Sequence, residues 1–219
     1  QNNGTTWTPI TLTDSFQRFV TPTGTITNPI IGFRIVTSGD AIDVDFTQQE
    51  VGAIATSAIS TAATSITRNA DVIIDTAVSG LIGQTQGTIY AEVDLKANAA
   101  ERRIISVTSG AEANRIIIWT LGTTLFVSFN SATSINLGAF PIGALKVAVG
   151  YTISGGSTTY SISTNGAAVT TGTSAVAPTG LNQINLGSST TPGLFLNDRI
   201  SAAAIYTSRL SDTELASLT

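Results

Sequence analysis

Apolar and polar residues alternate with a period of two in several short stretches of this 219-residue chain. In GTIYAEVDL (87–95), the odd-numbered positions from 89 to 95 are apolar, and Thr, Tyr, Glu and Asp fill the positions between them. Such alternation marks a strand with one buried face. Further stretches follow at intervals of roughly 8–12 residues, the spacing of strands in a sandwich or barrel. They are RIISV (103–107), NRIIIWT (114–120), TLFVSFN (124–130), GALKVAVGYTI (143–153), STTYSIS (157–163), NQINLG (182–187) and DRISAAAIYT (198–207). The chain from Asp71 onward therefore predicts an all-β antiparallel sandwich.

Turn-forming residues separate these stretches. SGG (154–156) joins two of them at a hairpin-like spacing. Asn165-Gly166 is a strong hairpin signal, because both residues accept positive φ.

The region before residue 55 also contains alternating stretches separated by turn-forming residues. GFRIV (32–36) and AIDVDF (41–46) flank TSGD (37–40), which has the chemistry of a turn. In AIDVDF the apolar residues fall on one face, and Asp43 and Asp45 fall on the other, so we expect a half-buried strand. The stretch 53–67, AIATSAISTAATSIT, is uncharged and rich in small and hydroxyl residues. It predicts a mostly extended connector.

The end of the chain combines a narrow strand with a helix start. RISAAAIY (199–206) contains three consecutive alanines, which leave room for a facing sheet and predict a central strand. In SDTE (211–214), Ser211 and Glu214 have the spacing of a capping box, and Leu210 and Leu215 that of a hydrophobic staple. These signals predict a helical turn over about residues 212–217 that is held on the sandwich by Leu215.

The composition excludes most catalytic chemistry, because the chain has no cysteine and no histidine. Thiolate nucleophiles, Cys-ligated zinc and Ser–His–Asp catalysis are therefore excluded. The net charge of −4 argues against nucleic-acid binding, and Arg102-Arg103 is interpreted as a solvated strand end. No apolar run is long enough to predict a membrane span.

Charged residues make up only 11% of the chain, against about 25% in a typical soluble domain. Two interpretations stay open: a neutral surface rich in Ser, Thr and Asn, or a surface buried against neighbouring subunits. The chain begins with Gln1 rather than methionine, so we expect it to be processed or numbered from within a longer polypeptide.

The C-terminal residues resemble a known family. LNDRISAAAIYTSRLSDTELASL (196–218) is similar to the last strand and terminal helix of concanavalin A-like (laminin G-like) jelly-roll domains. KVAVGYTISGGSTTYSISTNGAAV (146–169) is similar to the central hairpin of the same family. The resemblance covers about residues 71–219 and implies an antiparallel jelly-roll β-sandwich with a short C-terminal helix. It does not imply one function, since such domains include lectins, glucanases and adhesion modules.

A second resemblance lies upstream. DAIDVDFTQQEVGAIATSAI (40–59) is similar to the closing strand of carbohydrate-binding-like jelly rolls that are often found in bacteriophage fibre and tail proteins. It implies an N-terminal β segment, the C-terminal part of such a module, over residues 1–54, where we expect assembly contacts. A connector over residues 55–70 and the sandwich over residues 71–219 complete the expected organisation.

Two acidic sets were considered for chemistry. Glu92 and Asp94 lie on one face of a strand, as in glucanases of this fold, but the third acidic position of that motif is Ala97. A pair of this kind cannot carry out retaining hydrolysis alone, so we predict no catalytic residue and no enzyme activity. Asp43 and Asp45 are weak candidates for a calcium site, and no other cofactor is expected.

Sugar binding would use aromatic rings with polar neighbours. The candidates are Trp119, Tyr151, Tyr160 and Asn165, although packing in the core or between subunits is the preferred interpretation of Trp119, and packing between the sheets that of Tyr160. No set of them forms an evident site in the sequence.

The leading prediction is a non-enzymatic protein of a bacteriophage virion surface, such as a head fibre, capsid decoration or tail-fibre component. We expect a homo-oligomer, a trimer first, in contact with other virion proteins and with host surface glycans. The alternative is a carbohydrate-binding module of a larger secreted polysaccharide-active enzyme. A polysaccharide depolymerase is a third hypothesis.

Overall fold

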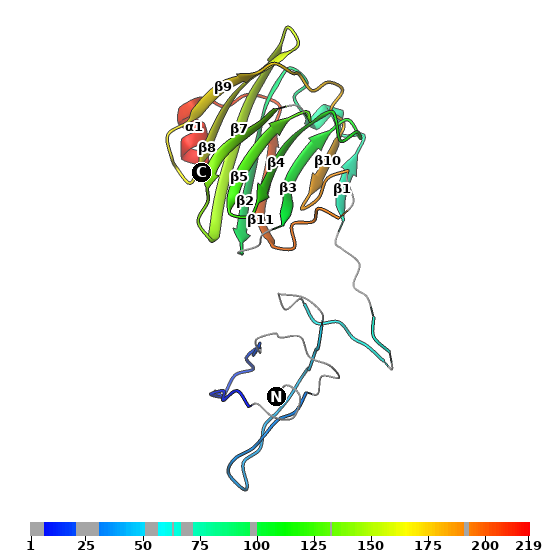
Figure 1. The fold of residues 1–219 in the computed structure, drawn as a ribbon, viewed down its shortest axis with the longest axis vertical. Coiled ribbons are helices and arrows are strands. Elements are labelled where there is room, and N and C mark those ends of the chain that lie inside the picture. Colours follow the sequence, from blue (N-terminus) through cyan, green and yellow to red (C-terminus); the bar gives the residue numbers. More distant parts are fainter. Residues whose placement is uncertain are drawn as a thin grey trace. The chain divides into compact units, whose positions relative to one another are not determined.

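The structure is a computed structural model that describes residues 7–20, 31–50, 57–62, 64–66, 72–96, 100–131, 133–190 and 193–219. The chain divides into two units, Gln1–Asn69 and Ala70–Thr219, which are described separately (Figure 1). In the described residues, no helix is long and apolar enough to cross a membrane.

The second unit is a sandwich of two antiparallel sheets (Figure 1). The six-stranded sheet has the order β1 (Ile73–Thr76), β10 (Gln183–Leu186), β3 (Glu101–Thr108), β4 (Arg115–Leu121), β5 (Thr124–Phe129), β6 (Thr133–Ala139). The five-stranded sheet has the order β11 (Arg199–Tyr206), β2 (Gln86–Leu95), β7 (Gly143–Ser154), β8 (Ser157–Thr164), β9 (Thr170–Ser174). A 3-10 turn, η1 (Ser79–Leu81), follows β1, and one helix, α1 (Asp212–Leu218), follows β11. The predicted all-β antiparallel sandwich with a short C-terminal helix is confirmed for this unit.

The core lies between the sheets and follows the predicted alternation. On β2, Ile89, Ala91, Val93 and Leu95 are buried in the main apolar cluster, whereas Asp94 is exposed. Tyr90 on the other face is also buried, because α1 covers this part of the five-stranded sheet.

The predicted turns have the backbone that their residues allow. Gly155 and Gly156, both at positive φ, form a two-residue connection between the paired Ser154 and Ser157. Asn165 and Gly166 also have positive φ. They lie in a longer loop, since the β8–β9 ladder ends at the pair Ile162 and Thr170.

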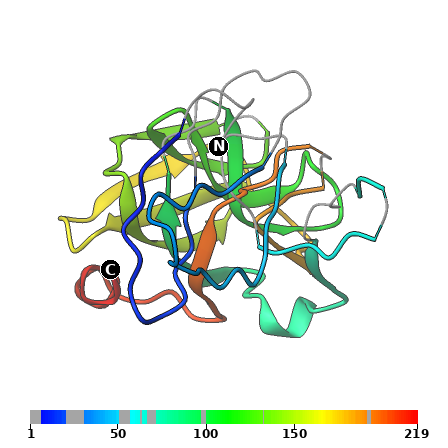
Figure 2. The same cartoon turned by 90° about the horizontal axis from the view of Figure 1, so that it is seen from below.

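The helix α1 begins at the predicted capping box. The Glu214 amide donates to the Ser211 hydroxyl at 3.3 Å, and the Ser211 amide donates to the Glu214 carboxylate at 2.7 Å. Leu215 is fully buried, and Leu210 packs in the same small cluster. The helix therefore lies against β7 and β8 on the outer face of the five-stranded sheet (Figure 2).

The position of strand β11 differs from the prediction of a central strand. It is an edge strand that pairs with β2 alone, and Ala202 and Ala203 are exposed. The three alanines are therefore not pressed by a facing sheet. A groove of about 520 Å³ runs beside Ala203 and Ala204, with Leu81 and Ile184 also in its walls.

The pair Arg102-Arg103 is not a solvated strand end, as the sequence had predicted. Arg102 is 1% exposed and Arg103 6%, and they lie on opposite faces of β3. Arg102 is paired with Asp198, whose carboxylate also accepts from the Lys96 amide at 3.2 Å. A partner 96 residues away in the sequence thus allows Arg102 to be buried.

The first unit has no strand in its described residues, 7–20, 31–50, 57–62 and 64–66. The predicted strands at 32–36 and 41–46 are therefore not formed within this chain, although the turn between them closes with a hydrogen bond from the Asp40 amide to the Thr37 carbonyl (3.4 Å). A strand needs a hydrogen-bonded neighbour as well as an alternating sequence. The described parts of the predicted connector, 57–62 and 64–66, contain neither helix nor strand.

Candidate functional site

The outer face of the six-stranded sheet carries a row of four neighbouring side chains. Because β4 alternates, Ile116 and Ile118 face the core and Trp119 faces outward. The ladders place Arg103 of β3 and Phe126 of β5 beside Trp119, and Asn136 of β6 beside Phe126.

Trp119 is the centre of this row. Its ring stacks on Phe126 with a centroid distance of 4.4 Å and an interplanar angle of 17°. The indole Nε1 donates to the Ser128 hydroxyl at 2.8 Å, and that hydroxyl lies 2.9 Å from the Ser134 hydroxyl. Trp119 and Phe126 are both half-buried, and Arg103 and Phe126 flank the indole from the two neighbouring strands, so only part of the aromatic pair is accessible.

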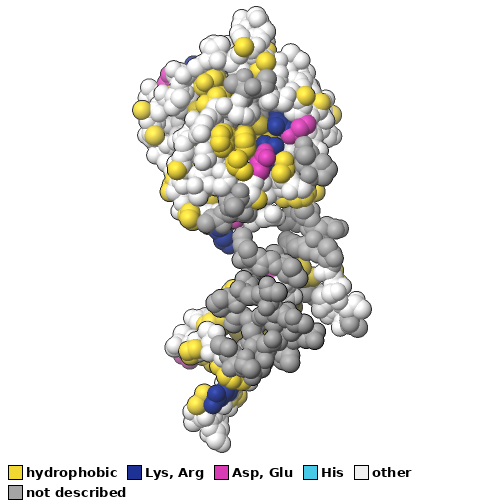
Figure 3. Space-filling view, in the orientation of Figure 1, with side chains coloured by type: hydrophobic (Ala, Val, Ile, Leu, Met, Phe, Trp, Pro, Cys, Tyr) yellow, Lys and Arg dark blue, Asp and Glu magenta, His cyan; other side chains and the backbone are white. Residues whose placement is uncertain are grey.

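Charged side chains lie against this aromatic pair. Arg103 Cζ is 5.2 Å from the Trp119 ring centroid, and Arg103 Nη2 is 2.5 Å from Glu101 Oε1 and 3.8 Å from Glu112 Oε1. Arg115 Nη1 contacts Glu112 Oε1, and Glu112 Oε2 accepts from the Thr190 hydroxyl at 2.5 Å. Figure 3 shows basic, acidic and hydrophobic side chains gathered on this face of the sandwich. We call Glu101, Arg103, Glu112, Arg115, Trp119 and Phe126 the outer-face cluster.

The surroundings of the outer-face cluster lower the pKa of both of its arginines. Burial lowers the pKa of Arg103, and Glu101 offsets part of that effect. Burial, together with the neighbouring positive charge of Arg103, lowers the pKa of Arg115 to about 10. Both groups stay charged at neutral pH, and the two carboxylates balance the two guanidinium charges.

Several donors on this face have no hydrogen-bond acceptor among the described residues. They include the Nε atoms of Arg103 and Arg115, which are both more than nine-tenths buried. Ser106 Oγ and Asn185 Nδ2, on the same face of β3 and β10, are also buried without a partner among these residues. An unpaired buried donor destabilises the fold, and because these atoms are closed off from solvent a ligand does not reach them in this conformation.

Of the residues considered from the sequence, Trp119 alone lies in this cluster. Tyr151 is fully buried in the core, and its hydroxyl donates to the Gly83 carbonyl at 2.7 Å. It cannot contact a ligand there. Tyr160 is half-buried and packs on Phe129 of the other sheet at a centroid distance of 5.5 Å.

Asn165 has a structural role. Its side-chain oxygen accepts from the Lys146 amide at 2.8 Å, which ties the β8–β9 loop to β7. The four candidates Trp119, Tyr151, Tyr160 and Asn165 therefore do not converge on one site.

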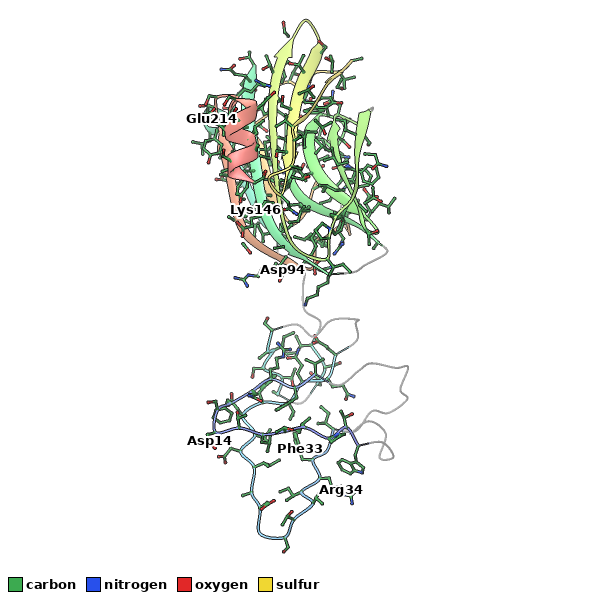
Figure 4. All side chains as sticks on the ribbon, turned by 90° about the vertical axis from the view of Figure 1, so that its left-hand side faces the viewer. Asp14, Phe33, Arg34, Asp94, Lys146 and Glu214 are labelled. Carbon is green, nitrogen blue, oxygen red and sulfur yellow. The ribbon has the colours of Figure 1, made fainter. Side chains whose placement is uncertain are left out.

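The acidic candidates belong to other segments of the chain than the outer-face cluster. Asp43 and Asp45 are exposed in the first unit, and no group of three or more potential metal ligands of the His, Cys, Asp and Glu types occurs in the part of the chain that the structure describes. Glu92 accepts from the Tyr90 hydroxyl at 3.1 Å and lies 4.0 Å from Lys146 Nζ. Figure 4 shows Lys146 and Asp94 on the sheet below α1. Ala97 lies outside the described residues.

Arg103, Arg115, Glu112 and Phe126 were not among the site residues expected from the sequence. One signal was present: in a chain with 11% charged residues, Arg115, Ile117 and Trp119 share one face of a single strand. The position of Arg103 beside Trp119 follows from the β3–β4 register, which includes a bulge between Arg103 and Ile105. Sequence alternation does not predict that register.

No protein-family model matches this chain, and no curated protein matches it. Solved structures are similar in fold. The leech intramolecular trans-sialidase is 17% identical with a TM-score of 0.49, covering 64% of this chain and 24% of its own. The CBM40 of Ruminococcus gnavus IT-sialidase is 16% identical with a TM-score of 0.46, covering 64% of this chain and 85% of its own.

Domain 4 of AbnA, an extracellular arabinanase from Geobacillus stearothermophilus, was solved in complex with arabinotriose. It is 16% identical with a TM-score of 0.47, and the match covers 64% of this chain and 68% of that one. The chain thus spans about a quarter of the leech enzyme and most of the R. gnavus CBM40.

Proposed function

We propose that the sandwich is a non-catalytic glycan-binding module and that the outer-face cluster holds the glycan. The observation that carries this proposal is the half-buried stacked pair Trp119–Phe126, with the Arg103 guanidinium carbon 5.2 Å from the indole centroid. An aromatic surface with a few fixed polar groups is the usual composition of a small-ligand site.

The chemistry of the cluster suits a sugar ring. The apolar face of a pyranose packs on the accessible part of the aromatic pair, while arginine N–H groups donate to ring hydroxyl or carboxylate oxygens. Glu101 and Glu112, each about one-third exposed, accept from hydroxyl groups. A planar guanidinium that is already held by a carboxylate loses little entropy on binding.

The groove beside β11 is a poorer candidate. The residues that line it, Gly80, Leu81, Ile105, Ile184, Leu186 and 203–208, include no charged side chain. Its polar side chains are the hydroxyls of Tyr206, Thr207 and Ser208, so it lacks the charge-assisted donors that the arginines of the outer-face cluster carry.

The setting of the module stays a prediction from the sequence. A virion surface protein would carry many copies and gain affinity for host glycans through multivalency. A module attached to a secreted polysaccharide-active enzyme would act as a single copy. Native mass and copy number in purified particles distinguish these two settings.

An array of neutral and carboxylate-bearing oligosaccharides, probed with the full chain, tests the function. We expect binding that Trp119→Ala abolishes and Tyr160→Phe leaves unchanged. The absence of binding to every oligosaccharide, with the sandwich folded, would contradict the proposal. Release of reducing ends from a polysaccharide would contradict its non-catalytic part.

A further inference from the structure

The described residues of the first unit contain no buried apolar side chain. The buried apolar residues of the described chain begin at Ile82. Large apolar residues of the first unit are instead exposed by 40% or more. They are Trp7, Ile10, Leu12, Phe16, Phe19, Val20, Ile31, Phe33, Ile35, Val36, Val44, Phe46 and Ile66.

The exposed apolar area is large for one chain. Taking roughly 150–250 Å² for each large side chain, the exposed fractions of these residues amount to roughly 1,000–1,700 Å² in total. The largest apolar patch on a typical monomer is about 300–600 Å², and a stable interface needs about 800 Å² from each partner. The first unit therefore exposes as much apolar area as a specific interface contains.

A turn at Thr37–Asp40 reverses the chain within this region. The central residues of the turn are Ser38 and Gly39, and Gly39 has a φ of 96°. Figure 1 shows the chain doubling back here. If the two arms paired as strands, counting outward from the turn would place Ile35 opposite Ile42, Phe33 opposite Val44 and Ile31 opposite Phe46. In that register all six side chains would share one face, which we call the arm face.

The opposite face of the same hairpin would carry charged residues. The same count places Arg34 opposite Asp43, Gly32 opposite Asp45 and Val36 opposite Ala41. Arg34 and Phe33 are labelled in Figure 4, and Arg34 Cζ lies 5.9 Å from the Trp7 ring centroid. In this register the hairpin would separate an uncharged apolar face from a charged one, whereas no strand ladder forms within the described residues.

We propose that the arm faces of several copies of this chain pack on one another and that residues 31–46 become strands in that assembly. The arm face carries no charge, so identical copies can meet there without burying one. The charged face remains outward in a symmetric arrangement about a common axis. This accounts for an alternating sequence that forms no strand within one chain. The inference does not depend on the proposed glycan site.

The first test is the native mass of the full chain, measured by sedimentation equilibrium over a range of protein concentrations. We expect a mass above the 22.5 kDa of one chain, and three times that value for the trimer predicted from the sequence. Phe33→Asp should weaken association at least about tenfold, because it buries a charge. Val36→Asp, at a residue that is 83% exposed on the opposite face, should not.

A monomeric full chain at all concentrations would overturn the proposal, as would equal weakening by Phe33→Asp and Val36→Asp. Near-ultraviolet circular dichroism verifies that the sandwich is folded in both variants. Binding of a monovalent oligosaccharide should be unchanged in Phe33→Asp, so that loss of assembly and loss of the glycan site are distinguishable.

A second test uses the absence of cysteine from the chain. Under copper-phenanthroline oxidation, Ile35→Cys should form a disulfide between copies. Val36→Cys should remain a thiol that a maleimide labels. Equal cross-linking of the two variants, or none in Ile35→Cys, would contradict the arm face as the contact.

Discussion

Arg103 and Trp119 are direct cross-strand partners on β3 and β4, and the guanidinium carbon of Arg103 lies 5.2 Å from the indole centroid. The arginine thereby fixes one side of the ring, and Phe126 stacks on the same indole. A tryptophan held in this way is pre-organised for a ligand, because little side-chain entropy is lost when a sugar packs on it.

Trp119→Ala should weaken binding of the best oligosaccharide from the array by at least about tenfold, or about 1.4 kcal/mol. Trp119→Phe should lose less affinity, because an aromatic ring remains. It removes only the Nε1 hydrogen bond to Ser128 and part of the ring. Isothermal titration calorimetry measures both. Trp7→Phe, which changes the other tryptophan of the chain, is the control and should bind normally.

Arg115→Lys should also reduce binding, even though the charge is kept. The lysine cannot supply a planar fork of donors to Glu112 and a ligand together. We expect a loss of about tenfold by calorimetry. Arg199→Lys, at an exposed position on β11, is the matched control. Equal affinities of Arg115→Lys and the parent chain would exclude Arg115 from the site.

Burial raises the pKa of Tyr151 to about 12 from its ordinary value of 10. A group whose folded pKa is raised stabilises the fold below the unfolded pKa, and this contribution is lost as the pH rises from 10 to 12. This rise in the pKa corresponds to about 3 kcal/mol in the free energy of unfolding. Tyr151→Phe should remove this pH dependence from the free energy of unfolding, measured by urea denaturation. An unchanged profile between pH 10 and 12 would contradict the assignment.

Asp198→Ala should lower the free energy of unfolding by about 3–5 kcal/mol, because it leaves the buried Arg102 without a counter-charge. The exposed Asp94 provides the control, and Asp94→Ala should have little effect. Replacing both partners, as in Arg102→Met with Asp198→Leu, should recover part of the loss. Denaturant midpoints compare the four proteins.

Local signals in the sequence predicted the elements that form from neighbouring residues. The capping box at Ser211 and Glu214, the apolar face of β2 and the Gly155-Gly156 turn all depend on residues close in the chain, and the structure confirms them. Sheet order depends on distant pairings. For that reason the position of β11 at an edge was predicted wrongly, since three alanines suit an exposed edge as well as a crowded centre.

The candidate site was less predictable for the same reason. Arg103 and Arg115 pair with acids that are close in the sequence, Glu101 and Glu112, but the contact of Arg103 with Trp119 depends on the β3–β4 register. Tyr151 has the sequence features of a binding residue but is held in the core by its hydrogen bond to Gly83, and a Cβ at Gly87 would overlap its hydroxyl. Residue type identifies candidates, whereas register decides which of them share a face.

The central claim, that a glycan packs on Trp119, has a direct test. The chain has two tryptophans, so Trp7→Phe leaves Trp119 as the only strong emitter, and its fluorescence can be followed while the best oligosaccharide is added. We predict a saturable change in emission with the same dissociation constant as calorimetry. Binding detected by calorimetry with no change in Trp119 emission would show that the glycan lies elsewhere and would contradict the account.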